Sequence, residues 1–414
     1  MRIAIIGPFA GPSLSAQFEF TGGAPLPAGY PGAPLMTVLA KALVDRGHDV
    51  AAISTDYPTP VAELEPFRAF RARRLTAYFC PQRPHSFRSS EGRHGRALDL
   101  FRCERDWLSA AIADYAPDVI HAHWTYEFAW AALDSGIPTV VTAHDSPRKV
   151  VRFMPSLYRI ARYLMARRVM PRCTHLTAVS PDLAADVRRL TSTPVTVVAN
   201  PIANAIRDGA GCSPQAFSGK TLMMVLNGWN DLKNGAIALR AFARARSIDP
   251  ALKLVCFGAG YEPRGNAQRW AQRRGFADGV EFRGPVPHDT VLRQMRESAA
   301  LVHPSRWEAC CMSIAEAMSV GLPVIAGRHT DGVSWQLDDG RAGVLADVTK
   351  VDDISRAMIT QTRDERAWRE MSTTARARAR QLFNVDQVVG QYVALYHAAL
   401  DSAATESVSR AVHP

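Results

Sequence analysis

The sequence lacks a long uninterrupted hydrophobic run. Nowhere in its 414 residues do about 18 apolar residues follow one another, which is the length that a helix needs to cross a bilayer. The apolar start of the chain is interrupted by Gly7 and Pro8, so it is also shorter than the core of a signal peptide. We therefore expect a cytoplasmic protein.

Cysteine is scarce, and its spacing argues against two common structural uses. The chain has seven cysteines, an odd number. It contains no C-x-x-C pair, so neither a disulfide framework nor a structural zinc site is expected. Cys310 and Cys311 are adjacent, and we interpret them as packing residues rather than reactive thiols.

Three ligand-binding fingerprints are absent. No G-x-G-x-x-G and no G-x-x-x-x-G-K-[ST] occurs, which argues against a dinucleotide site and a P-loop. No Asp-x-Asp triplet occurs, and we interpret residues 338–340 as a turn rather than a metal clamp. Aromatic residues make up 8% and are not interleaved with basic ones as a stacking platform, so we expect no nucleic-acid partner despite the net charge of +10.

What the chain does contain is an alternation of apolar strands and helical segments. With 47% apolar residues and a length well above the ordinary size of one domain, it predicts two large domains. Many of the apolar runs end in polar residues, as buried parallel strands with a ligand face at their carboxyl ends do. We predict two doubly wound, Rossmann-like α/β domains facing a cleft. The strand runs are 2–6, 47–53, 118–123, 138–145, 176–180, 195–201, 222–226, 252–258, 280–284, 299–303 and 324–326.

The composition also indicates where the domains begin and end. Residues 202–219 are rich in Gly, Ser, Ala and Pro, and we interpret them as a hinge. The first domain is then predicted over residues 1–201 and the second over residues 220–378. Residues 379–400 are expected to form a closing helix, and residues 401–414 a mobile tail with little to bury.

The most informative segment is residues 304–326, which contains Glu308 and Glu316 with seven residues between them. The apolar run before it is predicted to end as a strand. Ser313 is a candidate helix N-cap, and Gly321 a candidate helix end before the next strand. This pattern places one glutamate in a loop and the other on a short helix.

Such a helix start suits an anion. The backbone amides from Cys310 to Ser313 would have no partner within the helix and would favour a group such as a diphosphate. The neighbouring carboxylates can accept hydrogen bonds from sugar or ribose hydroxyls. The segment therefore indicates a nucleotide-sugar site. From the spacing alone, the alternative is an ordinary amphipathic helix with two solvated acids.

The segment and its surroundings resemble the E-x7-E motif of retaining glycosyltransferases of family 4, which have the two-domain GT-B fold. The resemblance covers most of the chain and includes R-G-H-D-V, D-V-I-H-A-H-W, V-V-T-A-H-D, V-S-P-D-L, N-P-I and F-G-A-G-Y. It implies an acceptor-binding first domain, a nucleotide-sugar-binding second domain and a last helix that returns to the first. It also implies a nucleotide-diphosphate sugar as co-substrate, no other cofactor and no metal.

The resemblance assigns roles to the residues of this motif. It places Glu308 near the hydroxyls of the donor sugar and Glu316 on the ribose of the nucleotide. The backbone amides near Cys311 and Met312, with Ser313 beside them, would bind the phosphates.

Basic residues are expected to neutralise the departing diphosphate. Lys233 follows the first strand of the second domain, where a cation could meet that group. Family members usually carry an arginine five residues before this lysine, but this chain has Gly228. Arg306 and Arg283 are candidates for the missing cation. The alternative for Lys233 is an ordinary solvated lysine.

The first domain contributes histidines and glycines to the predicted cleft. The resemblance places His144 beside the donor sugar, where a neutral imidazole could bond a hydroxyl; the alternative is a structural histidine held by Asp145. His121 and His123 alternate along one strand, and we interpret them as polar cleft residues, His123 being the better placed, rather than as metal ligands. In the loop before the first helix, Gly22 and Gly23 would let the backbone approach a ligand. These glycines and His123 are the candidate acceptor or cleft residues.

The most one-sided charge distribution lies in Val151–Arg172. No acidic residue occurs between Asp145 and Asp182, whereas arginines recur around an apolar stripe of Leu157, Ile160 and Leu164. Such a segment can lie on an anionic membrane surface, which would make the protein peripheral to the inner face of the membrane. The alternative is a helix with a solvated basic face.

Together these observations predict a retaining glycosyltransferase. It would move a sugar from a nucleotide-diphosphate sugar to the hydroxyl of a sugar or lipid-linked acceptor, in bacterial-type polysaccharide or glycolipid synthesis. Two alternatives remain open. One is a sugar-nucleotide epimerase of the same fold. The other is a non-catalytic sugar-nucleotide-binding relative, suggested by Gly228 and by Trp335, where family members often have a glutamate.

Overall fold

The structure is a computed structural model that divides into two compact α/β units. The first unit is Met1–Pro201 together with Val385–Pro414, and the second is Ile202–Asn384. The structure describes the whole chain except residues 23–24, 31, 57–64, 91, 204–205, 207–216, 218 and 413–414, and except the side chains of residues 406–412.

The first unit is built on an eight-stranded sheet in the order β3-β4-β2-β1-β5-β6-β7-β8. All neighbours pair in parallel except β3 and β4, which form an antiparallel pair at one edge. The strands are β1 (Arg2–Ile6), β2 (Asp49–Asp56), β3 (Arg68–Ala72), β4 (Leu75–Pro81), β5 (Val119–His123), β6 (Thr139–Ala143), β7 (His175–Ala178) and β8 (Val195–Val197). The sequence did not predict β3 or β4.

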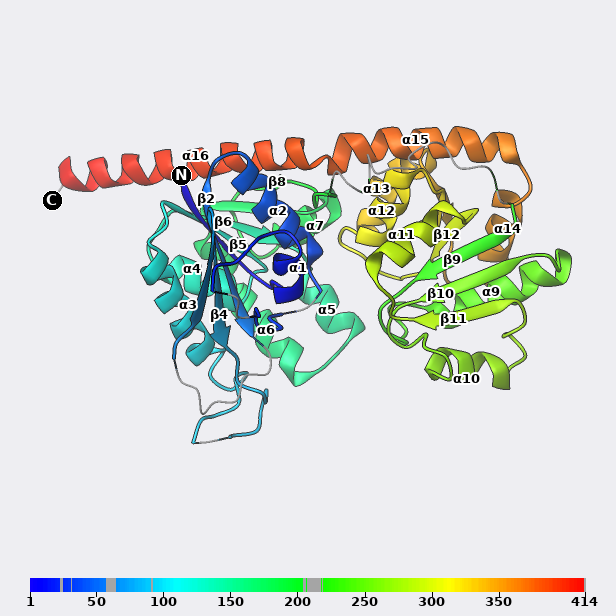
Figure 1. The fold of residues 1–414 in the computed structure, drawn as a ribbon, viewed down its shortest axis with the longest axis horizontal. Helices are drawn as coiled ribbons and strands as arrows, with labels where there is room; N and C mark the ends of the chain where they lie inside the picture. The colour runs from blue at the N-terminus through cyan, green and yellow to red at the C-terminus, as the bar shows by residue number, and fades with distance from the viewer. Residues whose placement is uncertain are drawn as a thin grey trace. The chain divides into compact units, whose positions relative to one another are not determined.

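Helices cover this sheet on both faces, as parallel strands require. Figure 1 shows α3 and α4 on one side of it and α2 on the other. The helices are α1 (Gly11–Ser15), α2 (Pro34–Asp45), α3 (Arg102–Tyr115), α4 (Glu127–Asp134), α5 (Pro147–Phe153), α6 (Leu157–Val169), the short η1 (Met170–Arg172), α7 (Pro181–Val187) and α16 (Val385–Val412). The last of these packs against α2, β5 and β6.

The second unit is built on a six-stranded, fully parallel sheet in the order β11-β10-β9-β12-β13-β14. Its strands are β9 (Thr221–Val225), β10 (Lys253–Phe257), β11 (Val280–Gly284), β12 (Ala300–His303), β13 (Val324–Gly327) and β14 (Val344–Ala346). Its helices are α9 (Gly235–Ile248), α10 (Asn266–Arg273), α11 (His288–Arg296), α12 (Met312–Val320), α13 (Asp331–Gln336), the short η2 (Asp338–Gly340), α14 (Val351–Gln361) and α15 (Glu365–Phe383).

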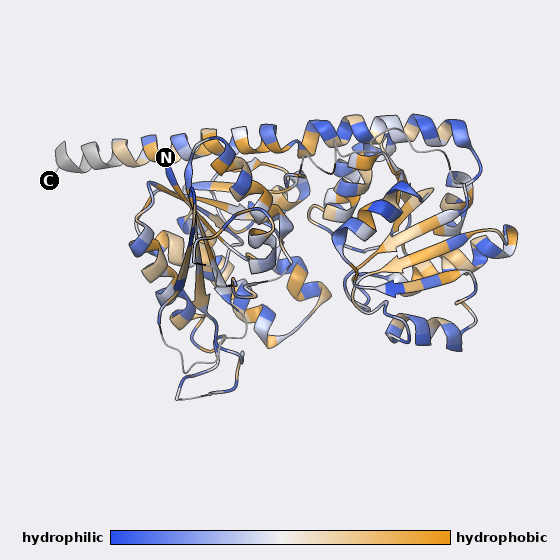
Figure 2. Cartoon of the chain, viewed as in Figure 1, coloured by the Kyte–Doolittle hydropathy of each residue, from blue (hydrophilic) through white to orange (hydrophobic). Residues whose placement is uncertain are grey.

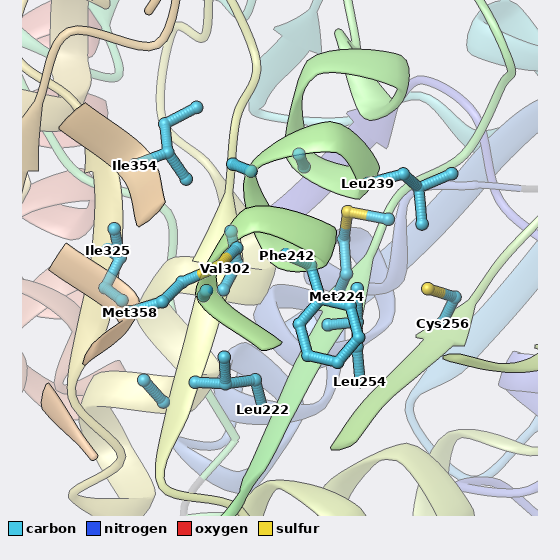
Figure 3. Packing of buried hydrophobic residues seen from close by; sticks show 14 of the residues in the cluster. Leu222, Met224, Leu239, Phe242, Leu254, Cys256, Val302, Ile325, Ile354 and Met358 are labelled. Carbon is cyan, nitrogen blue, oxygen red and sulfur yellow. The ribbon is translucent and has the colours of Figure 1, made fainter. Parts of the chain in front are cut away.

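The core of the second unit lies between its sheet and the helices α9 and α14. In Figure 3, Phe242 and Leu239 of α9 pack over Leu222 and Met224 of β9, and Met358 of α14 lies beside them. All five side chains are fully buried. Figure 2 shows the same pattern along the chain, with apolar strands inside and helices whose polar residues face outward. Burial of these apolar side chains stabilises the packing of the strands against the helices. The packed strands in turn fix where the polar loops after them begin.

The C-terminal segments of the chain differ from the expectation. The closing helix does not begin near residue 379: α15 of the second unit runs to Phe383, and α16 of the first unit begins at Val385. From residue 401, where a mobile tail was expected, α16 continues as a helix to Val412. The buried residues Val388, Tyr392 and Tyr396 belong to the predicted apolar stripe of this helix. The predicted hinge at 202–219 falls mostly outside the described residues.

No helix in the described parts of the chain combines the length and apolarity that crossing a membrane requires. This agrees with the absence of long apolar runs in the sequence.

The core of the second unit offers a direct test of its packing. Replacing Phe242 with Ala should lower the free energy of unfolding of this unit by about 3–5 kcal/mol, because it leaves a cavity between α9 and the sheet. Hydrogen-exchange mass spectrometry on the intact chain measures the two units separately. Ile248→Ala, on the same helix but with the side chain 55% exposed, is the matched control and should change stability by less than about 0.5 kcal/mol. Equal protection of the two variants would contradict this packing.

Candidate active site

The loops that follow the parallel strands of the second unit emerge at one edge of the sheet. The loop after β9 carries Lys233, and the loop after β12 carries Glu308. Two backbone hydrogen bonds tie this second loop to its neighbours. The Arg306 amide donates to the Leu232 carbonyl (2.9 Å), and the Gly332 amide donates to the Glu308 carbonyl (3.2 Å). The strand order therefore brings residues far apart in the sequence to one place.

Glu308 lies at the centre of this place. Its Oε1 atom accepts a hydrogen bond from Lys233 Nζ at 2.7 Å and faces His303 Nε2 at 3.1 Å. The Glu308 side chain is 15% exposed and that of Lys233 is 23% exposed. His303 is the last residue of β12 and is buried. Glu308 is therefore a paired carboxylate withdrawn from water, and Lys233 is not an ordinary solvated lysine.

The pKa values of these groups follow from their contacts. Burial alone would raise the pKa of Glu308, but the hydrogen bond with His303 and the charge of Lys233 lower it to about 2. Burial alone would lower the pKa of His303, but Cys311 and Glu308 raise it to about 9. The pKa of Lys233 is also raised, because the attraction of Glu308 and Cys311 exceeds the effect of burial. At neutral pH the cluster holds two cations and one carboxylate.

The helix α12 begins two residues earlier than the sequence suggested. Its N-cap is Cys311 and not Ser313, and no side chain caps it. The expected free amide at Cys311 is also wrong, because this amide donates to Gln336 Oε1 at 2.9 Å. The amides of Met312 and Ser313 donate to no group in the described part of the chain. They remain available to an anion at the helix start.

Glu316 lies one turn further along α12 and is nearly buried. Its Oε1 atom is 3.1 Å from His288 Nε2, and the two side chains are 10% and 51% exposed, respectively. The hydrogen bond with Glu316 raises the pKa of His288. Because Glu308 and Glu316 both lie out of bulk water, the alternative of a helix with two solvated acids is wrong.

The candidate cations that would replace the missing arginine differ in their surroundings. Gly228 has φ of +111°, a conformation that favours glycine, so an arginine here would be strained. The Nε atom of Arg283 donates to Glu281 at 2.7 Å on the exposed surface of β11. Arg306 is exposed and lies beside the loop that carries Lys233. Of the two arginines, Arg306 is the one next to Lys233 along the edge of the sheet.

A row of aromatic rings occupies the ends of two strands of the first unit. The rings of His121 and His123 lie 4.0 Å apart, and His123 Nδ1 is 2.8 Å from His144 Nε2. Trp124 packs over His144 at 4.3 Å. The predicted shared face of His121 and His123 is therefore confirmed, and His144 is held by His123 and Trp124 and not by Asp145. Asp145 instead accepts a hydrogen bond from a tyrosine, Tyr126, at 2.6 Å.

Burial keeps these histidines neutral. It lowers the pKa of His121 and of His144 to about 3, and that of His123 well below its usual value. A neutral imidazole at His144 suits a hydrogen bond with a hydroxyl group.

The two candidate glycines of the first unit are only partly placed. Gly22 is exposed, and the space into which a side chain would project from it is open. Gly23 lies outside the described residues.

The described residues contain one group of atoms that could hold a metal ion. A ligand atom from each of His303, Glu308 and Cys311 lies within 4.8 Å of the others. These residue types are common zinc ligands. However, Lys233 already donates to Glu308 and places a positive charge beside the carboxylate that the metal would need. We therefore describe this group as an ion-pair cluster.

Three side chains at this edge were not selected from the sequence. His303 pairs with Glu308, His288 pairs with Glu316, and Gln336 forms two hydrogen bonds with the backbone of Cys311. The position of His303 at the end of a buried strand was a visible signal, because polar residues at such positions face the ligand side of a sheet. His288 and Gln336 come from helices and gave no comparable signal.

The His303 cluster should make stability depend on pH. Because the folded-state pKa of about 9 exceeds the ordinary value of 6.5, the contribution is complete below about pH 6.5 and is lost as the pH rises through about 9. The variant His303→Leu should thus be less stable than the wild type by about 1–3 kcal/mol at pH 6, and the difference should shrink by pH 10. Melting temperatures across this range measure it. A difference that stays constant with pH would contradict the assignment of a charged His303.

Comparison with known families covers both units. The family described as "Glycosyltransferase Family 4" matches residues 35–204, and the family described as "Glycosyl transferases group 1" matches residues 214–380. The first match lies in the first unit apart from its last residues, and the second lies in the second unit. The two matches together cover most of the chain, and both families are described as glycosyltransferases.

A relative of known function matches over nearly its whole length. It is N-acetyl-alpha-D-glucosaminyl L-malate synthase of Bacillus anthracis, which is 24% identical over 380 residues, covering 87% of this chain and 92% of the relative. A D-inositol 3-phosphate glycosyltransferase of Acidothermus cellulolyticus is 31% identical over 127 residues, which is 28% of each chain.

Solved structures show the same fold. Sucrose-phosphate synthase from Thermosynechococcus elongatus superimposes with a TM-score of 0.72 at 16% identity, over 97% of this chain and 100% of that one. Anabaena HepE, solved in complex with UDP and glucose, superimposes with a TM-score of 0.65 at 17% identity, over 96% of this chain and 100% of that one. With both units matched by glycosyltransferase families and the fold shared, the chain belongs to the family 4 type of glycosyltransferases with the GT-B fold.

Proposed function

We propose that this protein transfers a sugar from a nucleotide-diphosphate sugar to an acceptor hydroxyl with retention of configuration, in polysaccharide or glycolipid synthesis. The observation that carries the proposal is the pairing of Glu308 with Lys233 beside the uncapped start of α12. A carboxylate suits sugar hydroxyls, and an ammonium group with free amides suits a diphosphate. The glycosyltransferase families matched by both units support the same chemistry.

In this proposal each group acts on one part of the donor. Glu308 orients the sugar, and Glu316 binds the ribose of the nucleotide. Lys233 and the amides of Met312 and Ser313 neutralise the charge that develops on the leaving diphosphate. Arg306 is the better candidate for a second cation, since Arg283 is paired with Glu281.

The reaction itself needs no nucleophile from the protein. The acceptor oxygen forms the new bond to the anomeric carbon on the face from which the diphosphate leaves, and the departing phosphate oxygen takes the acceptor proton. The charge that a metal ion would otherwise neutralise is met by Lys233 and the helix amides, so we propose a metal-independent reaction. His144, neutral and held by His123, would bond a sugar hydroxyl.

The donor can be identified by ligand-induced stabilisation. A ligand that binds only the folded state raises the melting temperature, so UDP-, GDP- and ADP-sugars can be screened by thermal shift. Glu316→Ala should abolish the shift given by the best donor, because the ribose contact is lost. Glu297→Ala, at an exposed position of the same unit, is the control and should keep the shift. An unchanged shift in Glu316→Ala would contradict the ribose role.

Transfer is then distinguished from the two alternatives by its products. A transferase releases the nucleoside diphosphate faster when an acceptor is added. An epimerase converts the donor without an acceptor, and a non-catalytic relative binds the donor without any turnover.

We propose further that α6 attaches the protein to an anionic membrane surface. Leu157, Ile160 and Leu164 form one stripe on this helix and are 70%, 44% and 40% exposed. Arg167 and Arg168 follow on the same helix, are exposed and form no ion pair within the described residues. An exposed apolar stripe with a basic border fits the boundary between acyl chains and anionic headgroups.

Vesicle binding tests this surface. The triple variant Leu157→Gln, Ile160→Gln, Leu164→Gln should bind vesicles of phosphatidylcholine and phosphatidylglycerol at least about tenfold more weakly than the wild type, since it loses the apolar area that enters the bilayer. Co-sedimentation measures the difference. Ile248→Gln, which changes an exposed apolar residue of the second unit, is the control and should bind as the wild type does. Equal binding of the wild type to pure phosphatidylcholine would contradict an anionic partner.

A further inference from the structure

The two oxygen atoms of the Glu308 carboxylate have different surroundings. Oε1 accepts from Lys233 Nζ at 2.7 Å and faces His303 Nε2 at 3.1 Å. Oε2 takes part in no hydrogen bond with the described residues. It is also not enclosed in the protein interior, so a ligand can reach it. One oxygen is thus occupied by two basic groups, and the other is left for a ligand.

His303 is the more rigid of the two partners of Oε1. It ends β12, which is paired on both sides by β9 and β13, and its side chain is 3% exposed. The sulfur of Cys311 lies 3.5 Å from its Nε2 atom and 3.8 Å from its Nδ1 atom. The imidazole is therefore held by strand pairing and by the N-cap of α12. Lys233, by contrast, reaches Glu308 with a long side chain from a loop.

We propose that His303 is a positioning residue for the donor sugar: it fixes Oε1 of Glu308 so that Oε2 faces the sugar hydroxyls. This inference rests on the proposed function, because it assigns the sugar to Glu308. It differs from a contact with the donor, since His303 acts only through the carboxylate.

The arrangement also explains why Glu308 needs two partners. In the proposed reaction the ammonium group of Lys233 must also interact with the diphosphate, so Glu308 and the diphosphate share this one cation. His303 has no such second role and keeps the carboxylate in place. The groups that face His303 are Cys311, Glu308 and, across the carboxylate, Lys233. Of these, Cys311 and Glu308 raise the pKa of His303 to about 9, so its imidazole is protonated at neutral pH.

The test compares the affinity for a nucleotide sugar with that for its nucleoside diphosphate. Isothermal titration calorimetry with UDP-glucose and UDP, GDP-mannose and GDP, and ADP-glucose and ADP gives the gain in affinity due to the sugar. His303→Leu should reduce this gain about tenfold or more, because a charged hydrogen bond that orients Glu308 is lost. His303→Gln can still donate to Oε1 and should keep most of the gain. His329→Leu, at an exposed position of the same unit, should behave as the wild type does.

Two further readouts separate positioning from a merely structural role. In the wild type the gain from the sugar should fall as the pH rises through about 9, the pKa of His303, and this fall should be absent in His303→Gln. In a Glu308→Gln background, His303→Leu should cause no further loss, because it acts through that carboxylate.

The outcomes distinguish this inference from the proposed function. If the wild type binds none of the six ligands, both are overturned. If it binds a nucleotide sugar and His303→Leu keeps the full gain from the sugar, only the role of His303 is overturned. Stoichiometric binding of Zn²⁺ by the wild type that is lost in His303→Leu would show that His303, Glu308 and Cys311 form a metal site, which also overturns the positioning role.

Discussion

A carboxylate removed from water must find positively charged partners, and in this protein that requirement organises one edge of the second unit. Glu308 meets Lys233 from the loop after β9 and His303 from the end of β12, and its own carbonyl accepts from Gly332 after β13. Three separate strand ends are therefore joined around one residue. The cost of leaving that carboxylate unpaired explains why these loops adopt defined positions.

Much of the fold followed from sequence patterns because those patterns express burial. The strand ending at His303, the helix ending at Gly321 and the parallel order of both sheets depend on apolar periodicity and on glycine at a left-handed position, φ of +80°. The antiparallel strand β3 was missed because its residues are mostly exposed and give no apolar run. The start of α12 was misplaced because serine is a common N-cap, whereas here the backbone of Cys311 is held by Gln336 from another helix.

The candidate site was only partly predictable for a related reason. Glu308 and Glu316 were selected from their spacing and the resemblance that it carries, and Lys233 from its place after the first strand of the second domain. Their partners His303 and His288 were not selected. The pairing of His288 with Glu316 joins distant segments and leaves no periodic signal, whereas the position of His303 at the end of a predicted strand did give a signal. The contact between His144 and His123 could likewise not be predicted from the sequence, because it depends on the pairing of two strands that bring these residues together. Gly228 stands where the resembled family usually has an arginine, which from the sequence looked like the loss of a phosphate-binding residue. The structure gives a backbone reason for the glycine, because its φ of +111° favours that residue.

The return of α16 to the first unit has a consequence for how the molecule is made. The first sheet is flanked by residues that leave the ribosome after the whole second unit: Tyr396 of α16 bonds His121 of β5 at 2.7 Å, and Tyr392 packs on the same ring. The second unit, a continuous stretch of chain, can complete its folding while the earlier-synthesised unit still lacks one of its covering helices. During synthesis the first unit can therefore be completed only after the second unit has been made.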